Sequence, residues 1–410
     1  MVTTKVQPAR NTIDTTADRS PLSNETTRLL AAIRDLAPGI AARADEIEGG
    51  RRVPGDIIEA LRRIGVFRML VPRSHGGLEL SIPEVVPVLE ALSAAESSVG
   101  WVAMIALTSQ VFCTRLSRGS YDRLYADGPD VVVTGAGTPA GRAEKIDGGY
   151  RITGRWPFAS GCQNAQWIVA HCVLCQDGVP MMSGDGPLTR FFTIPAECWR
   201  IEETWQASGL RGSGSHHVAL EDFNTPDASA IDLIHGMSCV PGPFEAAVAS
   251  FIAIFHGAVA VGIAAGALAD LASMAAAGRR QLFAATTLRD SPVFQHEFGR
   301  IAAEQRAAQA LLEVQAASHW RRALEGTLDG KADFTEGLQA SAWINSACAG
   351  VVSTCYTLGG ASAVLNTSPL QRRLRDIHAA RQHVFAQERF YALAGAQHLG
   401  FPPVDPITGR

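Results

Sequence analysis

Three blocks of different hydrophobic periodicity follow one another along the chain. From Asn24 to about Glu48, and again from Pro54 to Ile64, apolar residues recur with the 3.6-residue period of helices, and a break is expected at Pro38. Further helices are expected from Pro83 to Leu92 and from Ser98 to Leu116. The last of these is apolar on most sides, and such a helix must be largely buried.

Near Val131 the period changes from 3.6 to 2, which is typical of half-buried strands. Glycines and prolines separate the segments, so we expect a β-rich middle domain, either a sheet or a barrel. Within it, Gly135-x-Gly137-x-x-Ala140 imitates a dinucleotide-binding fingerprint, but Pro139 interrupts it and no helical pattern follows; we expect a loop there. The expected strands are Val131–Val133, Tyr150–Arg155, Trp167–Leu174, Thr189–Ile194, Trp199–Glu203 and His217–Phe223.

After Pro226 the helical period returns and predicts an antiparallel four-helix bundle. Its first helix contains the uncharged stretch 246–269, which is long enough to span a membrane. This stretch is rich in Ala and Gly, includes His256, and lacks flanking basic and aromatic anchors, so we expect a buried bundle helix instead. The expected helices are Phe244–Ala277, Pro292–Leu324, Thr335–Leu365 and Pro369–Leu399.

The fold class expected from these blocks is α+β. The predicted division is a mobile N-terminal tail at 1–20, an N-terminal helical domain at 21–130, a central β-barrel-like domain at 131–234 and a C-terminal four-helix bundle at 235–410. The tail is polar and charged and has no apolar core, unlike a signal peptide or an anchor, so a cytoplasmic protein is expected.

Composition narrows the classes of partner. The 410 residues are 47% hydrophobic and 19% charged, as in a globular protein with a substantial core. A net charge of −4 with interspersed signs offers no basic field for nucleic acid and no polybasic membrane patch. A small-molecule ligand is therefore the expected partner.

Eight cysteines are scattered through apolar segments, which indicates buried reduced thiols rather than a disulfide framework. His171, Cys172 and Cys175 form H-C-x-x-C, but no second Cys or His pair is placed to complete four ligands. We expect no metal.

The stretch from Gly148 to Gly161, GGYRITGRWPFASG, combines a hairpin signal with a strand. Trp156, Phe158 and Ser160 lie two residues apart, so the pattern places them on one strand face. Two rings and a hydroxyl would suit a planar, hydrogen-bonding ligand. A half-buried aromatic strand that ends in a serine turn also explains the pattern and, from the residues alone, is the simpler interpretation.

The order of helices, strands and helices, together with several motifs, resembles the acyl-CoA dehydrogenase fold. It is most similar to the branch of flavin-dependent monooxygenases that use reduced flavin supplied by a separate reductase. The resemblance covers about residues 25–400. The motifs that carry it are Val71-Pro72 with Gly76-Gly77, Gly100-Trp101, GGYRITGRWPFASG, LRGSGSH at 210–216 and SPLQRRLRDIHAARQH at 368–383.

The catalytic base distinguishes the acyl-CoA dehydrogenases from the flavin-dependent monooxygenases of the same fold. Acyl-CoA dehydrogenases abstract an α-proton with a glutamate shortly after an Arg-Asp pair, which here is Arg375-Asp376. Val384 occupies the corresponding position, and 251–269 offers no carboxylate at the family's alternative site. Without a carboxylate base that dehydrogenation cannot proceed. A serine and a histidine instead suit a flavin hydroperoxide, formed from reduced FMN and O2, which survives where water is excluded.

The resemblance implies roles for individual residues. Ser160 would hydrogen-bond the central-ring nitrogen of the flavin, and His383 would approach the hydroperoxide or the substrate hydroxyl. His378 is the alternative histidine; on one continuous helix the two would point about 140° apart and would not share a role. Each histidine can also be explained as a surface residue or a capped core residue.

Cofactor contacts are implied in the same way. Trp156 and Phe158 would wall the isoalloxazine, and Gly161 would allow close backbone approach. Arg211 and Ser213 would offer donors to a phosphate or a flavin edge, although Arg211 also fits a glycine-flanked turn. The remaining implied contact is Arg280 with Phe283, which resembles a segment that reaches flavin phosphate across a subunit interface and implies a homotetramer. Arg279 and Arg280 could instead complement a helix C-terminus.

The helix after Gly100 bears on the substrate. Phenol-hydroxylating relatives often carry a histidine in this helix, whereas this chain has none between Gly100 and Leu116, which weakens the case for a small phenol. Trp101 and Ser109 are the expected substrate-binding residues. Small side chains such as Ala103 and Ala106 would leave room for a bulky polycyclic compound.

The expected function is the oxygenase component of a two-component flavin-dependent monooxygenase. It would hydroxylate an aromatic or polycyclic small molecule with O2 and reduced FMN, with FAD possible, delivered by a separate NAD(P)H-dependent reductase. Three alternatives remain open: an N-hydroxylating relative acting on an amine or amino sugar, an acyl-CoA dehydrogenase with a relocated base, and a helical scaffold without catalytic activity.

Overall fold

The computed structural model describes residues 22–184, 186–233, 235–240, 242–243, 248–328, 330–402 and 404. The chain packs as two compact units. The sheet unit contains the described residues of 24–81 and 98–245, and the helical unit contains residues 22–23, 82–97 and the described residues of 246–410. The predicted mobile tail at 1–20 lies outside the described residues.

These units are defined by packing, and their limits differ from the predicted domain boundaries at 130 and 234. The predicted boundaries therefore stay a prediction. Helix α4 (Ile82–Ala95) belongs to the helical unit, where it packs against α7 (Val248–Ala276) and α8 (Pro292–Leu324). Gly262 of α7 makes this approach possible, because a Cβ there would lie 2.4 Å from the carbonyl oxygen of Glu90. A sequence pattern alone does not show that this early helix packs with the last ones.

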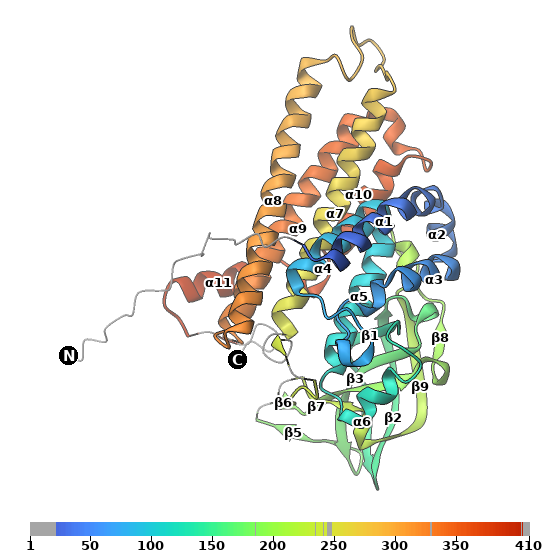
Figure 1. Ribbon diagram of the computed structural model, residues 1–410, viewed down its shortest axis with the longest axis vertical. Coiled ribbons are helices and arrows are strands. Elements are labelled where there is room, and N and C mark those ends of the chain that lie inside the picture. The colour runs from blue at the N-terminus through green and yellow to red at the C-terminus, as the bar shows by residue number, and fades with distance from the viewer. Residues whose placement is uncertain are drawn as a thin grey trace, which may run out of the picture. The chain divides into compact units, whose positions relative to one another are not determined.

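Short helices precede the strands of the sheet unit (Figure 1). The predicted break at Pro38 is wrong, because α1 continues through Pro38 and the chain turns only at Arg43. A proline removes one backbone donor, and the uninterrupted helix keeps Leu29, Ile33 and Ile40 buried. The helices of this unit are α1 (Asn24–Ala42), α2 (Ala44–Gly50), α3 (Gly55–Ile64), α5 (Ser97–Cys113) and α6 (Arg118–Leu124), with 3₁₀ turns at Val66–Arg68 and Arg73–His75.

Helix α5 is buried nearly all round, as its apolar sequence predicted. Two glycines of the sheet unit allow neighbouring backbone to approach it. A Cβ on Gly161 would lie 3.0 Å from the side chain of Val102, and one on Gly135 would lie 3.0 Å from Ser109 Oγ. The helix is therefore fixed against the start of β1 and against the turn that follows β2.

The sheet is mixed, and its strands run in the order β10-β7-β3-β1-β2-β9-β8, with β4 also paired to β3. Strands β1 and β3 are parallel, and the other pairs are antiparallel. Among the described strands no ladder joins β10 to β8, so the predicted barrel is not confirmed. The strands are β1 (Val133–Ile146), β2 (Gly149–Ala159), β3 (Trp167–Gln176), β4 (Val179–Pro180), β7 (Thr189–Pro195), β8 (Arg200–Glu202), β9 (His216–Pro226) and β10 (Ala230–Ile231), with β5 (Met182–Ser183) and β6 (Gly186–Pro187) as a separate pair.

The loop predicted around Gly135 and Gly137 is wrong, because both residues lie inside β1. Gly135 pairs with Val169 of β3, and the register shifts between Ala136 and Gly141. The glycines belong to an irregular strand that packs against α5. They do not form the strand-to-helix turn of a dinucleotide-binding site, which is consistent with the rejection of that fingerprint.

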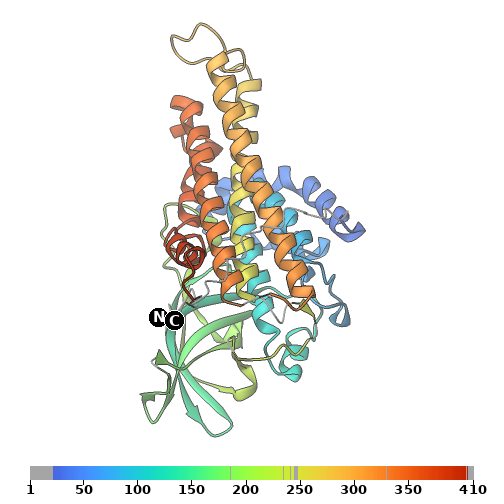
Figure 2. The same cartoon turned by 90° about the vertical axis from the view of Figure 1, so that its left-hand side faces the viewer.

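The helical unit is built around long helices. Figures 1 and 2 show α7, α8 and α9 side by side, and α4 and α10 pack against α7. Helix α8 begins and ends where predicted, since Ser291 caps it and Pro292 occupies its first turn. The elements are α7, α8, α9 (Ala332–Gly359), α10 (Pro369–Ala380) and α11 (Phe390–His398), with 3₁₀ turns η8 (Gly360–Val364) and η9 (Val384–Ala386).

The last predicted helix, 369–399, is wrong as a single element. Helix α10 ends at Ala380, and the side chain of His383 then caps η9 by accepting the backbone N–H of Phe385. The break brings Phe385 and Phe390 into one apolar cluster with Phe334 of α9. Burial of these rings outweighs the continuation of the helix.

Two of the described helices, Ser250–Ala276 and Ala332–Val364, are long and apolar enough to cross a membrane by length and composition. In the first, 89% of the most apolar window is buried inside the structure. This burial confirms the prediction of a buried bundle helix for the described part of that stretch.

Candidate functional site

Strand β2 does not place Trp156, Phe158 and Ser160 on one face, so that prediction is wrong. Phe158 has a φ of +63°, and the register with β9 shifts between Trp156 and Ala159. The alternation of faces is therefore lost at this point. Trp156 is fully buried in the core of the sheet unit and donates its indole N–H to the carbonyl of His171 at 2.6 Å. The Trp156 side chain thus has no exposed surface in this structure, whereas Phe158 is 62% exposed; a flavin contact of Trp156 stays a prediction.

Ser160 follows β2 and belongs to a row of buried hydroxyl groups. Its Oγ accepts the indole N–H of Trp101 at 3.2 Å and lies 2.6 Å from Ser215 Oγ. Ser215 Oγ lies 2.7 Å from Ser213 Oγ. The register pair Ala159 with His216 explains this contact, because it places the neighbouring residues Ser160 and Ser215 side by side.

Backbone hydrogen bonds hold this row in place. The N–H of Gly161 donates to the carbonyl of Ser213 at 2.7 Å, and the hydroxyl of Thr134 donates to the carbonyl of Ser160. Gly161 has a φ of +75° and faces Val102, so its freedom from a Cβ is used in packing against α5. The position of the Ser160 hydroxyl is thus set by two strands and one helix.

Other residues predicted to contact the flavin lie close in sequence to this row of hydroxyl groups. Phe158 meets the ring of Trp205 edge-on, with centroids 6.2 Å apart. Arg211, in the 3₁₀ turn Arg211–Ser213, forms an ion pair with Glu48 at 3.6 Å and remains 40% exposed. This guanidinium therefore retains accessible surface for an anionic ligand.

The two predicted substrate residues on α5 have different surroundings. Trp101 directs its N–H to Ser160, as described above. Ser109 donates its hydroxyl to the carbonyl of Ile105 one helical turn earlier, at 2.9 Å, and faces Gly135 of β1. The structure thus brings Trp101 together with Ser160, whereas the contacts of Ser109 are with its own helix and the sheet.

His383 lies in the helical unit, where it caps η9. Its Nδ1 accepts the backbone N–H of Phe385 at 3.4 Å, so in the neutral ring Nε2 carries the proton. The imidazole stacks on that of His256 from α7, with centroids 4.1 Å apart and an interplanar angle of 26°. Burial, followed by the nearby His256, lowers the pKa of His383 well below its ordinary value. The ring is therefore neutral at pH 7.

His378 has other neighbours. It lies in the last turn of α10, is exposed, and its Nε2 is 3.3 Å from Ser353 Oγ on α9. Partial burial and then Arg381 lower its pKa. The two histidines belong to different elements and contact different helices.

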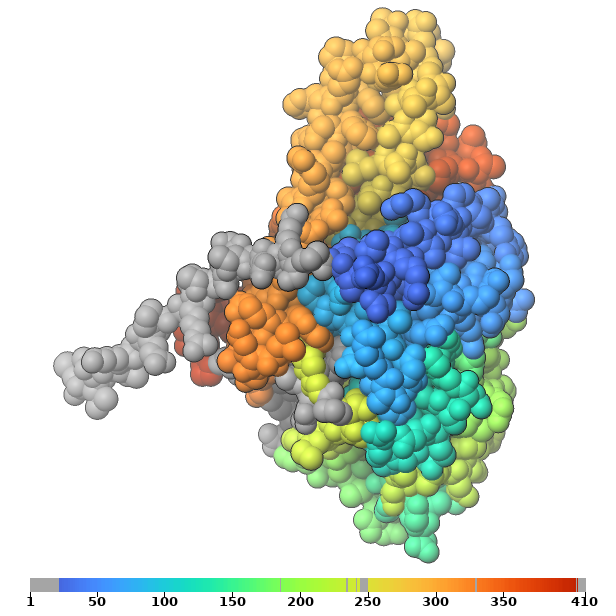
Figure 3. Space-filling model, viewed as in Figure 1, coloured from blue at the N-terminus to red at the C-terminus, as the bar shows by residue number. Residues whose placement is uncertain are grey.

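Arg280 and Phe283 lie in the segment between α7 and α8, which Figure 3 shows as part of the gold surface of the helical unit. Arg280 Nε donates to the carbonyl of Ala284 at 2.7 Å and closes a tight turn. Phe283, at the tip, has a φ of +64° and is 96% exposed, next to the exposed Leu282. Residues 280–285 line a shallow hollow.

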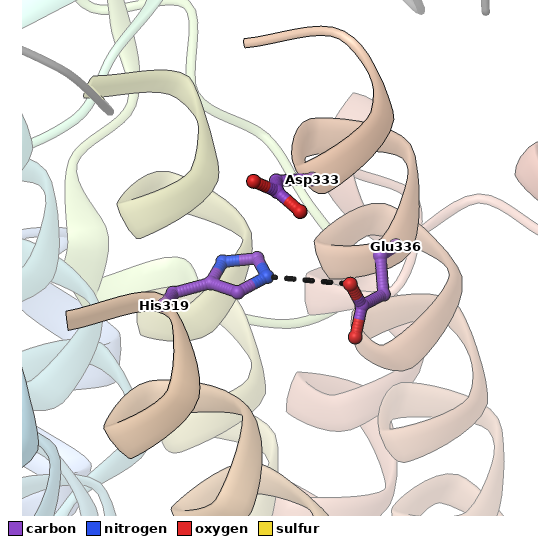
Figure 4. A group of neighbouring side chains, drawn as sticks. All are labelled: His319, Asp333 and Glu336. Carbon is purple, nitrogen blue, oxygen red and sulfur yellow. Dashed lines mark ion pairs between the residues drawn. The ribbon is translucent and has the colours of Figure 1, made fainter. Parts of the chain in front are cut away.

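Metal-ligating side chains gather at one place among the described residues: His319 of α8 with Asp333 and Glu336 of α9 (Figure 4). The guanidinium of Arg322 forms ion pairs with both carboxylates, at 3.1 Å for Glu336, and His319 Nε2 lies 3.9 Å from Glu336. A cation already neutralises these carboxylates, so we interpret the group as an ion-pair cluster that joins α8 to α9.

The H-C-x-x-C segment is not a gathered set of ligands. His171 Nδ1 binds the carbonyl of Gly137 at 3.0 Å, and its ring stacks on Phe191 at 4.0 Å. Cys172 and Cys175 are buried free thiols. All eight cysteines are free and six of them are buried, in agreement with the prediction of reduced core thiols.

Two residues in contact with the predicted site were not identified from the sequence. Ser215 lies inside LRGSGSH, but its pairing with Ser160 depends on the register of β9 on β2. His256 stood out only as a histidine in an uncharged apolar stretch. That isolation was the available signal for a polar role inside the helical unit.

Family models match both ends of the chain. The model of the acyl-CoA dehydrogenase N-terminal domain matches residues 23–120, and that of the C-terminal domain matches residues 254–388. The fold, with helices on either side of a central mixed sheet in chain order, is that of this class of protein.

Relatives match nearly the whole chain. The indole-3-acetate monooxygenase of Pseudomonas putida is 32% identical over 379 residues, which are 92% of this chain and 93% of the relative. The flavin-dependent monooxygenase oxygenase subunit HsaA of Rhodococcus jostii is 29% identical and covers 91% of this chain and 98% of its own length. The chain belongs to the acyl-CoA dehydrogenase family, in its branch of flavin-dependent monooxygenases.

Solved structures agree with this assignment. The 3-HSA hydroxylase from Rhodococcus sp. RHA1 superimposes with a TM-score of 0.84 at 26% identity, over 93% of this chain and 99% of that one. XiaF from Streptomyces sp., in complex with FADH2 and glycerol, has a TM-score of 0.86 at 24% identity over 92% and 96%, and supports the fold.

Proposed function

We propose that this chain is the oxygenase component of a two-component monooxygenase that hydroxylates an aromatic or polycyclic small molecule. The observation that carries the proposal is similarity over nearly the whole chain to flavin-dependent monooxygenases, combined with Val384 in place of the dehydrogenase's carboxylate base and a neutral histidine, His383, directly before it. A histidine that is neutral at pH 7 can donate a hydrogen bond from its ring N–H without placing a charge in a buried site.

The proposed cofactor is reduced FMN, with FAD as the alternative. A relative is described as FADH(2)-dependent, XiaF binds FADH2, and TdsC from Paenibacillus sp. binds FMN. The donor set of this chain suits a flavin, since Ser160 offers a fixed hydroxyl, Phe158 an exposed ring, and Arg211 an accessible guanidinium. The bound flavin supplies the two electrons that O2 activation requires.

Within this proposal the residues have separate tasks. Ser160 hydrogen-bonds the central ring of the flavin, and Gly161 and Ser213 fix the backbone beside it. His383 presents its Nε2 proton to the oxygen that is transferred or to the substrate hydroxyl. His378 is the weaker candidate, because its ring is exposed and directed at Ser353.

The proposed substrate is a planar ring system of two or more rings, with Trp101 and Ser109 as its contacts on α5. Relatives are named for indole-3-acetate and for resorcinol, and one TdsC structure contains indole. Helix α5 has no histidine to bind a phenol, whereas it carries small residues. This composition favours an indole-like compound over a single phenol ring.

We further infer a cytoplasmic homotetramer supplied by a separate NAD(P)H-dependent reductase. Helix α9 supports the assembly, because only 39% of the most apolar window in Ala332–Val364 is buried within one chain and Trp343 on it is exposed. Arg280 and Phe283 would then reach the flavin phosphate of a neighbouring subunit. A barrel-like curvature of the sheet and a four-helix core in the helical unit are inferred from the family.

The test is a single-turnover reaction. Protein is loaded anaerobically with reduced FMN, then mixed with ¹⁸O₂ and indole-3-acetate, indole or resorcinol, and the products are analysed by mass spectrometry. One ¹⁸O atom in a ring product supports the proposal. Reduction of bound FAD by an acyl-CoA, without oxygen transfer, would identify a dehydrogenase, and a chain that binds no flavin would be a scaffold.

A further inference from the structure

His256 and His383 form a pair of stacked imidazoles inside the helical unit. His256 lies in the middle of α7, and its Nδ1 donates to the carbonyl of Ile252 at 2.9 Å. His383 lies after the end of α10, and its Nδ1 accepts a backbone N–H instead. The two rings are 4.1 Å apart and nearly parallel. In the neutral pair, therefore, the proton is on Nδ1 of His256 and on Nε2 of His383.

Aromatic rings complete the surroundings of the pair. The Phe385 ring lies 5.6 Å from His256 and 5.5 Å from His383, and Phe334 of α9 follows at 6.0 Å from Phe385. These rings offer no counter-ion to a protonated imidazole. A second positive charge 4 Å from the first would also be repelled in a site of low dielectric.

Charged groups on the neighbouring elements are paired with one another. Arg381 binds Glu388 at 3.0 Å, and the carboxylates at the start of α9, Asp333 and Glu336, form ion pairs with Arg322. His256 is a titratable group in direct ring contact with His383. The stack and the apolar rings beside it therefore act directly on the protonation of His383.

We infer that His256 is a positioning residue that stacks against His383 and keeps that ring in its neutral Nε2–H form. The ring stack restricts rotation of the His383 side chain, together with the 3.4 Å hydrogen bond at its Nδ1. Burial by the same stack opposes protonation. The importance of this for hydroxylation rests on the proposed function, whereas the effect on the His383 ring does not.

Two substitutions of His256 test whether an aromatic ring against His383 is required, or only a side chain that fills the same space. His256→Phe keeps an aromatic ring against His383 without a titratable group. His256→Gln has similar length but no ring. Protein labelled at its histidine rings is titrated between pH 5 and 8.5 by NMR, without flavin, and the His383 resonance is identified by its loss in His383→Gln.

In the parent and in His256→Phe, we expect His383 to remain a neutral Nε2–H tautomer across this range. In His256→Gln we expect both tautomers and a titration midpoint that moves toward the ordinary value of about 6.5. The inference is overturned if His383 stays neutral and singly tautomeric in a folded His256→Gln protein.

A second readout connects the stack to catalysis. In the flavin-loaded enzyme, His256→Gln should lose hydroxylated product relative to hydrogen peroxide about tenfold more at pH 6 than at pH 8, whereas His256→Phe should resemble the parent at both pH values. An NMR change without any hydroxylation by the parent would refute the proposed function and leave the positioning role intact. A pH-independent loss in both variants would show a purely structural role and overturn the inference.

Discussion

The indole N–H of Trp101 donates to Ser160 Oγ at 3.2 Å, and both side chains are buried. Trp101 lies in the first half of α5, and Ser160 lies directly after β2. Because an indole N–H can only donate, it occupies one acceptor site of the serine oxygen. The hydroxyl proton of Ser160 therefore points away from Trp101, and it can be donated to Ser215 Oγ or to a ligand that binds beside Ser160.

Replacing Ser160 by alanine is expected to affect the outcome of the oxygen reaction more than flavin binding. One neutral hydrogen bond contributes about 0.5–1.5 kcal/mol, so the affinity for reduced FMN should fall less than about tenfold. The yield of hydroxylated product should fall, and release of hydrogen peroxide should rise by the same amount. Ser74→Ala, at an exposed serine of the same unit, is the control. An unchanged ratio of product to peroxide would remove Ser160 from the mechanism.

The Trp101–Ser160 hydrogen bond can be measured by a double-mutant cycle. Trp101→Phe keeps a ring and removes the N–H, and Ser160→Ala removes the acceptor. We expect the two changes in unfolding free energy to be non-additive by about 1 kcal/mol, the contribution of one buried hydrogen bond. Urea unfolding of the parent, the two single variants and the double variant provides the values. Additivity within about 0.3 kcal/mol would show that the contact is not energetically important.

The course of β2 shows what periodicity can predict and what it cannot. Alternation from Tyr150 to Arg155 indicated the strand, and the burial of Ile152 agrees with it. The left-handed conformation of Phe158 could not be predicted, because a bulky residue with φ above zero is rare and has no sequence signal. That one residue directs Trp156 and Phe158 to different environments.

The end of a helix could likewise be predicted only where a local sequence signal marks it. Ser291 and Pro292 marked the start of α8 correctly, since capping and first-turn preferences are local. The end of α10 at Ala380 has no glycine or proline to mark it. It is fixed by the packing of Phe385 and Phe390, and the pairing of His383 with His256 depends on the same long-range contact. Such partners become visible only once the helices are assembled.

His383 and His378 are expected to differ in their effect on coupling. His383→Ala should lower the yield of hydroxylated product about tenfold or more while hydrogen peroxide rises, because a proton held at Nε2 is lost. His378→Ala should leave the ratio within about twofold, since that exposed ring contacts Ser353. Product and peroxide are quantified in the same single-turnover samples. If both variants couple like the parent, His383 has a structural role only.

Arg280 is expected to contribute to flavin affinity through the assembled protein. Its segment is exposed in one chain, and a charge-assisted hydrogen bond to a phosphate supports an affinity change of about tenfold. Arg280→Ala should weaken FMN binding by this factor without changing the mass of the oligomer. Arg279→Ala is the matched control. Titration calorimetry and native mass spectrometry give the two quantities, and equal losses in both variants would indicate a general effect of charge at the end of α7.

Glu90 makes the stability of the helical unit depend on pH. Its Oε2 accepts a hydrogen bond from Gln309 at 3.2 Å, and its Oε1 is buried without a hydrogen-bond partner among the described residues. Burial, and then the negative charge of Glu313, raise the pKa of Glu90 to about 8, from an ordinary value of 4.5. Between these two pH values the unfolded chain releases a proton that the folded chain retains. Stability therefore falls as the pH rises from 4.5 to 8 and does not change further above that.

Glu90→Gln removes this ionisation and keeps an acceptor for Gln309. We expect the variant to be more stable than the parent by roughly 2–4 kcal/mol at pH 8.5 and by less than about 0.5 kcal/mol at pH 4.5. Urea unfolding followed by circular dichroism at both pH values measures the difference. Glu325→Gln, at a half-exposed carboxylate directly after α8, should show no such dependence. A gain that is equal at both pH values would mean that Glu90 is ionised in the folded protein at neutral pH, with its charge compensated.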